Sequence, residues 1–158
     1  MEDGKMATEI ERKFLIADEA WRADVVSRIV MRQNYLATRP AVRVRLAGDR
    51  GYLTIKGKTR NFSRAEYEYP IPAADAAEML DRLCEGHEIC KTRHLVPFGG
   101  KTWEIDVFEG ENAGLVVAEI ELESEDEPFE LPPWIGEEVT GRKEYYNSAL
   151  SRTPWTMR

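Results

Sequence analysis

Cysteine and histidine are scarce in this sequence of 158 residues, which contains two of each. The two cysteines, Cys84 and Cys90, are too few for a disulfide framework or for a zinc site made by this chain alone. Cysteines that stay reduced are typical of cytosolic proteins, so we expect a cytoplasmic location. His87 and His94 stand apart and show no spacing suited to a metal.

Long hydrophobic runs and an excess of basic residues are also absent. No segment has the length of a membrane-spanning helix, and no charged segment followed by an apolar one marks a signal peptide. The formal net charge is -7 at pH 7, whereas a nucleic-acid-binding domain is normally basic. We therefore expect neither a membrane nor a nucleic acid as a partner.

The length and composition fit one domain over residues 1–158. Hydrophobic residues make up 42% of the chain, which is enough for a core, and charged residues make up an unusually high 32%. Residues 1–6 are polar and are expected to be a flexible leader, and residues 140–152 are expected to form a terminal helix.

Charged residues recur at alternate positions in seven short segments of the chain. These segments are Glu9-Ile10-Glu11-Arg12-Lys13, Arg43-Val44-Arg45, Lys56-Gly57-Lys58, Glu66-Tyr67-Glu68, Lys91-Thr92-Arg93, Glu104-Ile105-Asp106 and Glu119-Ile120-Glu121. Side chains two apart in a strand share one face, and the residues between the charges are mostly apolar. One such strand is typical of any sheet with a wet face. Seven of them, sorted by sign, indicate a sheet with one packed face and one densely charged face.

The hydrophobic pattern predicts a mainly β fold (α+β class) with an antiparallel core and a few peripheral helices. Strands are expected over residues 8–16, 33–37, 41–46, 52–58, 64–71, 88–96, 101–108 and 115–122. Helices are expected from Asp18, a good cap, to about Met31, over residues 73–83, and at the terminal segment.

A charged face of this kind suits a multiply charged anion together with its metal. Lys and Arg bind phosphate, and several of them together suit a chain of two or three phosphates. Carboxylates would repel such a ligand unless they hold a hard cation such as Mg²⁺ or Mn²⁺. The sequence has no Gly-rich phosphate loop and no Ser, Cys or His nucleophile set, so water is the expected nucleophile.

At these residues the chain resembles the CYTH superfamily, the triphosphate tunnel metalloenzymes. The similarity begins with the E-x-E-x-K signature in Glu9-Ile10-Glu11-Arg12-Lys13 and continues in order along nearly the whole chain. The further matching segments are Gln33-Asn34-Tyr35-Leu36, Arg43-Val44-Arg45, Leu53-Thr54-Ile55-Lys56, Lys91-Thr92-Arg93, Glu104-Ile105-Asp106-Val107-Phe108, Ala118-Glu119-Ile120-Glu121 and the segment 133–140. The resemblance implies a CYTH-like tunnel domain, a closed eight-stranded antiparallel β-barrel that binds triphosphate with Mg²⁺ or Mn²⁺.

The resemblance also implies a role for each matching residue. The metal ligands would be Glu9, Glu11, Glu119 and Glu121. The phosphate-binding residues would be Lys13, Arg43, Arg45, Lys56, Lys58, Lys91 and Arg93. The catalytic residues would be Lys13, Tyr35, Lys91, Glu104 and Asp106, of which Glu104 and Asp106 would place a second metal or the attacking water. Tyr35 fits equally well as a half-buried strand aromatic, since aromatic residues favour strands.

The expected function is metal-dependent hydrolysis of inorganic tripolyphosphate to pyrophosphate and phosphate. One alternative is another enzyme on the same scaffold, a class IV-like adenylate cyclase or a thiamine or nucleoside triphosphatase. Another is a polyphosphate-binding module without turnover. A homodimer is also open. The terminal helix resembles the family's tunnel-closing helix through Tyr145 and Asn147, whereas Arg142 and Glu144 depart from its pattern, so lid contacts stay open for this chain.

Overall fold

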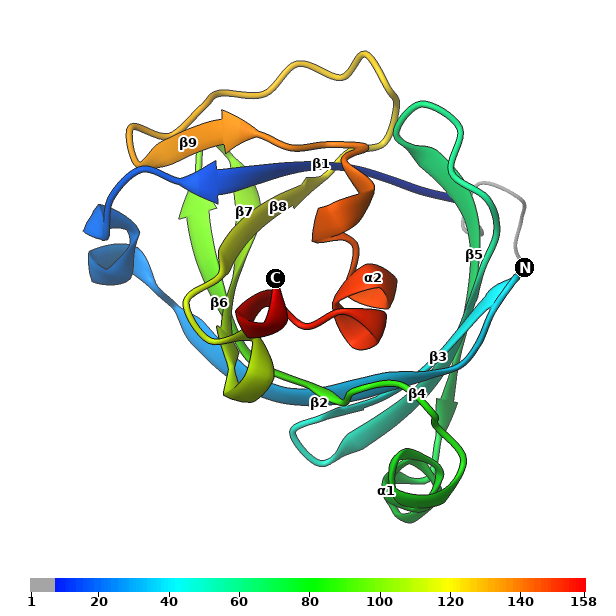
Figure 1. Cartoon of the computed structure of the whole chain (residues 1–158). Coiled ribbons are helices and arrows are strands. Elements are labelled where there is room, and N and C mark those ends of the chain that lie inside the picture. Colours follow the sequence, from blue (N-terminus) through cyan, green and yellow to red (C-terminus); the bar gives the residue numbers. More distant parts are fainter. Residues whose placement is uncertain (1–7) are drawn as a thin grey trace.

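The computed structural model describes residues 8–158, and the strands in them form a closed barrel that Figure 1 shows along its axis. The strands are β1 Thr8–Ile16, β2 Ser27–Thr38, β3 Ala41–Ala47, β4 Arg50–Lys56, β5 Ser63–Ile71, β6 Ile89–Phe98, β7 Lys101–Glu109, β8 Val116–Glu121 and β9 Ile135–Glu138. Their order is β5-β4-β3-β2-β6-β7-β8-β1, and β1 pairs with β5 to close the barrel. The predicted closed, eight-stranded antiparallel barrel is confirmed. The expected leader, residues 1–6, lies outside the described residues.

Strand β1 holds the closure together because it pairs with three other strands. Its first residues pair with β5, in the register Glu9↔Arg64, and its middle pairs with β8, in the register Lys13↔Glu119. Its last residues pair with β9, which extends the sheet outside the closed barrel. The strand β9 has four residues and was not predicted from the sequence.

The helices are short. They are η2 Ala20–Asp24, α1 Ala73–Arg82, η3 Gly110–Asn112, η4 Lys143–Tyr145, α2 Asn147–Arg152 and η5 Trp155–Met157. Helix α1 lies outside the barrel, where Ala76 and Leu80 pack against Val44 of β3. Within residues 8–158 we find no helix with the length and hydrophobicity needed to cross a membrane.

The helix predicted from Asp18 to Met31 is wrong. A single 3-10 turn, η2, is followed by β2, which begins at Ser27. Trp21 is fully buried, but Val26 and Val30 are 68% and 63% exposed, so the apolar positions do not form one buried helical face. Residues Val25, Val26, Ile29 and Val30 are β-branched and favour a strand over a helix.

The main hydrophobic core lies outside the barrel wall. The apolar residues of the alternating segments point outward, and Ile105 and Ile120 pack there with Phe14, Trp103 and Trp134. The segment between β8 and β9 covers this core, as the upper part of Figure 1 shows. Burying the apolar face on the outside leaves the inside of the barrel to the charged residues.

A second core closes one end of the lumen from the inside. Ile89, Phe108 and Val117, which share the inward faces of their strands, pack against Tyr145 and Leu150 of the C-terminal segment. Figure 1 accordingly shows α2 in the centre of the barrel, so this helix is not peripheral as predicted.

The terminal helix is also shorter than the predicted range of 140–152. It begins at Asn147, after the 3-10 turn η4. Thr140 does not cap it, because the Thr140 hydroxyl accepts a hydrogen bond from the Lys13 backbone N–H at 2.8 Å. This contact ties the C-terminal segment to β1 instead.

Candidate active site

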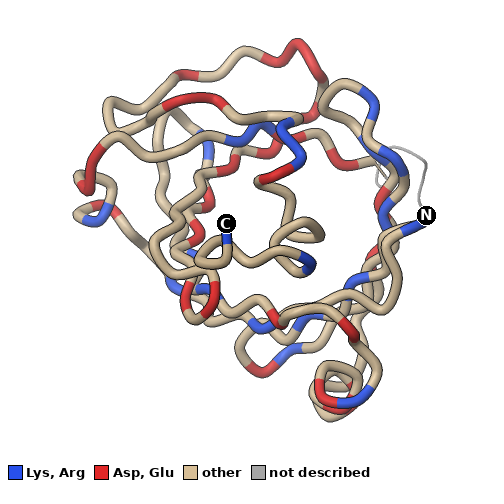
Figure 2. Tube along the Cα trace, in the orientation of Figure 1, with Lys and Arg blue, Asp and Glu red and all other residues tan. Residues whose placement is uncertain are grey.

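The inward faces of the strands enclose a cavity of about 240 Å³. Charged residues at alternate positions line it, as the strand pairing places them on one face, and Figure 2 shows both signs along the barrel strands. The charged residues that line the cavity are Glu9, Glu11, Lys13, Arg43, Arg45, Lys56, Arg64, Glu66, Glu68, Lys91, Arg93, Glu104, Glu119 and Glu121. The cavity is therefore polar over most of its wall.

A basic wall is formed by β3 and β6, which flank β2. Arg45 Nε donates a hydrogen bond to Gln33 Oε1 at 2.7 Å, and Arg45 forms no ion pair with any carboxylate of residues 8–158. Burial and repulsion from Arg43 and Arg93 lower the pKa of Arg45 to about 9. The Nε atom of Arg43 is buried and has no hydrogen-bond acceptor in the described chain. Both guanidinium groups can therefore donate hydrogen bonds to an anionic ligand.

Lys91 and Arg93 share one carboxylate, that of Asp106 on β7. Asp106 Oδ2 lies 2.7 Å from Lys91 Nζ, and Asp106 Oδ1 lies 2.8 Å from Arg93 Nε. Burial would raise the pKa of Asp106, but the two cations lower it. Burial, Arg93 and Arg45 lower the pKa of Lys91 to about 7 in spite of its contact with Asp106. Arg93 also contacts Glu104 at 3.3 Å and Glu119 at 3.6 Å, so this end of the basic wall is joined to the acidic residues beside it.

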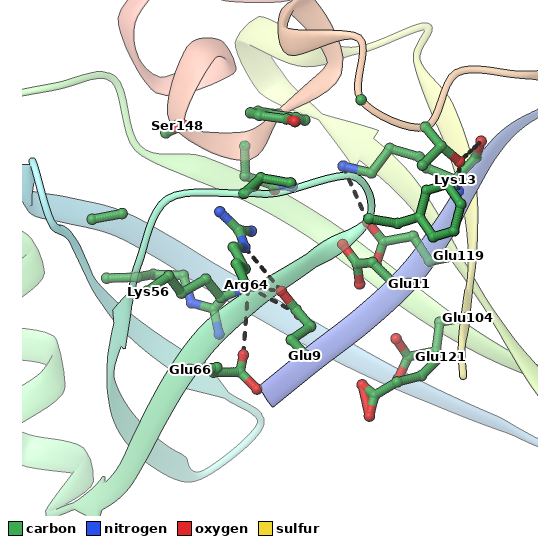
Figure 3. A pocket seen from close by; sticks show the side chains of 18 of the residues that line it. Glu9, Glu11, Lys13, Lys56, Arg64, Glu66, Glu104, Glu119, Glu121 and Ser148 are labelled. Carbon is green, nitrogen blue, oxygen red and sulfur yellow. Dashed lines mark hydrogen bonds and ion pairs between the residues drawn. The ribbon is translucent and has the colours of Figure 1, made fainter. Parts of the chain in front are cut away.

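A third set of cations surrounds Glu9, as Figure 3 shows. Lys56 Nζ lies 3.2 Å from one Glu9 oxygen, and Arg64 Nε lies 3.0 Å from the other. Burial opposes the ionisation of Glu9, but these cations lower its pKa to about 2. Lys56 also contacts Glu66 at 3.5 Å, so this lysine is balanced by two carboxylates.

The acidic wall is formed by β7, β8 and β1, and Figure 3 shows its carboxylates gathered on one side of the cavity. Glu11 lies opposite Glu121 in the β1–β8 register, and Glu104 lies opposite Glu119 in the β7–β8 register. Burial, Glu119 and Glu9 raise the pKa of Glu11 to about 8. Burial also raises the pKa of Glu104 and of Glu121, in both cases with the help of nearby carboxylates.

This acidic wall fits a divalent cation by its chemistry. Like charges directly opposite each other in a sheet destabilise it, and a bound cation removes that repulsion. Carboxylate oxygens are the ligands that Mg²⁺ and Mn²⁺ prefer. Among residues 8–158 no three metal-binding side chains converge closely enough to form a complete site by themselves. The carboxylates are thus neighbours that a metal and its water molecules could bridge.

The structure brings most of the predicted site residues together, while their individual roles stay predictions. Tyr35 lines the main cavity and also a second cavity that Ser151 and Arg152 of α2 help to line. Asp106 lies behind Lys91 and Arg93 and holds them. Lys58 is exposed on the segment after β4 and is not among the residues that line the cavity, because β4 ends at Lys56 and the alternation stops there.

Two residues that line the cavity, Arg64 and Asn147, and Gln33, which contacts Asn147 from behind the lining, were not predicted as site residues. Arg64 was considered only as a possible phosphate ligand at a loop end, Gln33 only as part of a matching segment, and Asn147 only as part of the resemblance to a tunnel-closing helix. Gln33 shares the inward face of β2 with Tyr35, so the face it lies on could be read from the sequence. The entry of Asn147 into the lumen could not, because it depends on where the C-terminal segment packs.

Known proteins of similar sequence and structure agree with this site. An inorganic triphosphatase of Acetivibrio thermocellus is 47% identical over 152 residues, which cover 95% of this chain and 97% of that protein. An inorganic triphosphatase of Nitrosomonas europaea is 39% identical over 150 residues, which cover 91% of this chain and 97% of that protein. A crystal structure of an inorganic triphosphatase superposes with a TM-score of 0.65 at 38% identity and covers 90% of this chain and 93% of that one. The family model of the CYTH domain matches residues 7–154, and the chain therefore belongs to the CYTH domain family.

Proposed function

We propose that this protein hydrolyses inorganic tripolyphosphate to pyrophosphate and phosphate inside the barrel, with residues 1–158 acting as one tunnel domain. The observation that carries the proposal is the division of one enclosed cavity into a basic wall and an acidic wall. A basic wall alone would suit any polyanion, whereas the acidic wall suits the metal that a triphosphate brings with it. Two relatives that align over nearly their whole length are named inorganic triphosphatase.

The basic residues would bind and orient the phosphate chain. Arg43 and Arg45 carry donors that no described carboxylate neutralises fully, and Lys91 and Arg93 lie beside them, held by Asp106. Lys13 on β1 and Lys56 on β4 would add two more cations, and Tyr35 would donate its hydroxyl. Phosphoryl transfer depends mainly on such positioning and charge stabilisation, which preorganised cations supply.

Glu9, Glu11, Glu119 and Glu121 would hold Mg²⁺ or Mn²⁺. When bound, the metal would neutralise phosphate oxygens and polarise the phosphoryl group. The raised pKa of Glu104 suits it to accept the proton of the attacking water, because a base works best with a pKa near the operating pH. Asp106 is a poorer base, because Lys91 and Arg93 lower its pKa, and we assign it the orientation of those two cations.

The direct test is the release of phosphate from tripolyphosphate by the purified protein with Mg²⁺ or Mn²⁺. We expect equal amounts of pyrophosphate and phosphate, and no release in the presence of EDTA. A protein that releases no phosphate with either metal across a broad pH range would contradict the proposal.

Other triphosphates are the main alternative substrates. A cyclase or a thiamine or nucleoside triphosphatase needs room for an organic group beside the phosphate chain. One end of the lumen is filled by Tyr145 and Leu150, so less room is left there than an open tunnel offers. Turnover of ATP, of thiamine triphosphate and of tripolyphosphate, with cyclic AMP as the marker of a cyclase, separates these activities.

The outer face of β5 is a candidate interface for a homodimer. Tyr67 and Tyr69 are 48% and 54% exposed on the outer face of β5, which makes that face available to a second copy in a homodimer. Sedimentation at several protein concentrations tests whether the protein forms this dimer.

Cys84 and Cys90 are both free, in keeping with the proposed cytoplasmic location.

A further inference from the structure

A chain of hydrogen bonds links the basic wall to the C-terminal segment. Arg45 Nε donates to Gln33 Oε1 at 2.7 Å, and Gln33 Nε2 donates to Asn147 Oδ1 at 2.9 Å. Lys91 Nζ donates to the same Asn147 oxygen at 3.1 Å. Two strands of the wall and the first residue of α2 are thus connected by two side-chain amides.

The direction of this chain follows from the chemistry of its ends. Arg45 and Lys91 are donors only, and a side-chain amide has one acceptor oxygen and one donor nitrogen. Arg45 therefore requires the Gln33 oxygen, which leaves the Gln33 nitrogen to donate to Asn147. Asn147 receives donors from both Gln33 and Lys91, so its oxygen must face them. Its Nδ2 must then point away from them.

The position of Asn147 is held by contacts on the other side of α2. Ser151 Oγ donates to Asn34 Oδ1 at 2.8 Å, and Asn34 Nδ2 donates to the carbonyl of Gly86 at 2.9 Å. Leu150 is fully buried against the inner core. The helix therefore cannot rotate to give Asn147 another orientation without breaking these contacts.

Asn147 lines the main cavity, and its Nδ2 makes no hydrogen bond with any of residues 8–158. We propose that Asn147 is a substrate-binding residue whose Nδ2 donates a hydrogen bond to a phosphate oxygen, with Gln33 as the residue that positions it. This inference rests on the proposed function, since it concerns the same cavity and the same ligand. It adds an uncharged donor from the C-terminal segment to cations that all come from the barrel strands.

The test replaces the donor without removing the acceptor. Asn147→Asp keeps an oxygen for Gln33 and Lys91 but places an acceptor where Nδ2 was. Because a hydrogen bond to a charged group contributes about 1.5–3 kcal/mol, we expect the KM for tripolyphosphate to rise roughly tenfold to a hundredfold. Asn147→Ala removes both roles, and we expect a smaller rise in KM, since it adds no repulsive charge.

Asn61→Asp is the matched control for added charge. Asn61 also lines the cavity, but its Nδ2 already donates to Glu125 at 3.5 Å. We expect this variant to raise the KM by no more than a few-fold. An Asn147→Asp variant whose KM lies within the range of this control would overturn the inference.

The wild-type protein provides a second readout that does not depend on how a variant folds. The side-chain amide signals of Asn147, identified in a ¹H–¹⁵N spectrum by their loss in Asn147→Asp, should shift when tripolyphosphate is added with EDTA. Unchanged Asn147 signals, while backbone signals of the cavity strands shift, would also overturn the inference. A wild-type protein that neither binds nor hydrolyses tripolyphosphate overturns the proposed function itself, so the two failures are distinguishable.

Discussion

Glu11 on β1 and Glu121 on β8 lie directly opposite each other inside the barrel, and neither forms an ion pair with any of residues 8–158. Each of the neighbouring carboxylates has a cation: Glu9 pairs with Lys56, and Glu119 pairs with Lys13 at 3.3 Å. Two unpaired carboxylates in register destabilise a sheet. The barrel tolerates this repulsion at one place in its acidic wall, which is the place where a cation would remove it.

The first prediction concerns the pH dependence of stability. Unfolded Glu11 loses its proton near 4.5, but in the folded protein burial and neighbouring carboxylates raise its pKa to about 8. Between these values the folded state binds more protons than the unfolded state, so the free energy of unfolding falls as the pH rises. Glu11→Gln should flatten this decline. Urea unfolding with EDTA at a series of pH values from 4.5 to 8 measures it.

Two controls accompany this measurement. Glu78→Gln changes an exposed carboxylate on α1 and should leave the decline as it is. Mg²⁺ should reduce the decline in the wild-type protein, because a bound cation favours the ionised carboxylates. A decline that is equally steep in Glu11→Gln and in the wild-type protein would contradict the assignment.

The second prediction concerns Arg45 and Lys58, which were both predicted from the sequence to bind phosphate. Arg45 lines the cavity without a carboxylate partner, whereas Lys58 is exposed and outside it. Arg45→Gln should weaken binding of tripolyphosphate roughly tenfold to a hundredfold, the range for one charged hydrogen bond. Lys58→Gln should change the affinity by less than about twofold, because an exposed charge is screened by salt. Titration calorimetry measures both, and an equal loss in the two variants would place Lys58 at the ligand.

Most of the barrel could be predicted because its pattern is local. The alternation of charged and apolar residues in segments such as Glu104-Ile105-Asp106 identifies a strand and assigns each side chain to a face. The hairpin of β6 and β7 follows from two such strands joined across Gly99 and Gly100, both of which have a positive φ. These features depend only on residues close together in the chain.

The errors occur where distant contacts decide the structure. Trp21, Val25, Ile29 and Val30 have a helical spacing, but the pairing of β2 with β6 from Ser27 onward makes Ile29 and Val30 part of a strand. Thr140 has the chemistry of a helix cap, but it binds the backbone of Lys13. The role of α2 in closing the lumen depends on Phe108 and Val117, which lie far from it in sequence. The contact between Gln33 and Asn147 joins two segments far apart in the chain, so the sequence could not show that these two amides meet.

The third prediction tests whether the docking of α2 supports binding. Leu150 is fully buried in the inner core, and Leu80 of α1 is 6% exposed, where it packs on the outside of the barrel. Leu150→Ala and Leu80→Ala should each lower the free energy of unfolding by about 2–5 kcal/mol. Leu150→Ala alone should also weaken binding of tripolyphosphate, because α2 carries Asn147 into the cavity. Unfolding in urea and titration calorimetry on the same samples measure both effects, and equal binding by the two variants would contradict the link.

The last prediction separates an enzyme from a binding module. Glu119 and Glu121 lie on the acidic wall, and a carboxylate there repels a phosphate chain unless a cation lies between them. The double variant Glu119→Gln, Glu121→Gln should therefore lose most of its turnover with Mg²⁺ or Mn²⁺. In EDTA its affinity for tripolyphosphate should hold or rise, because two negative charges have been removed. Phosphate release measures the first effect and titration calorimetry the second. A variant that keeps full turnover would exclude these two carboxylates as metal ligands, whereas a wild-type protein that binds tripolyphosphate tightly but releases no phosphate would be a binding module.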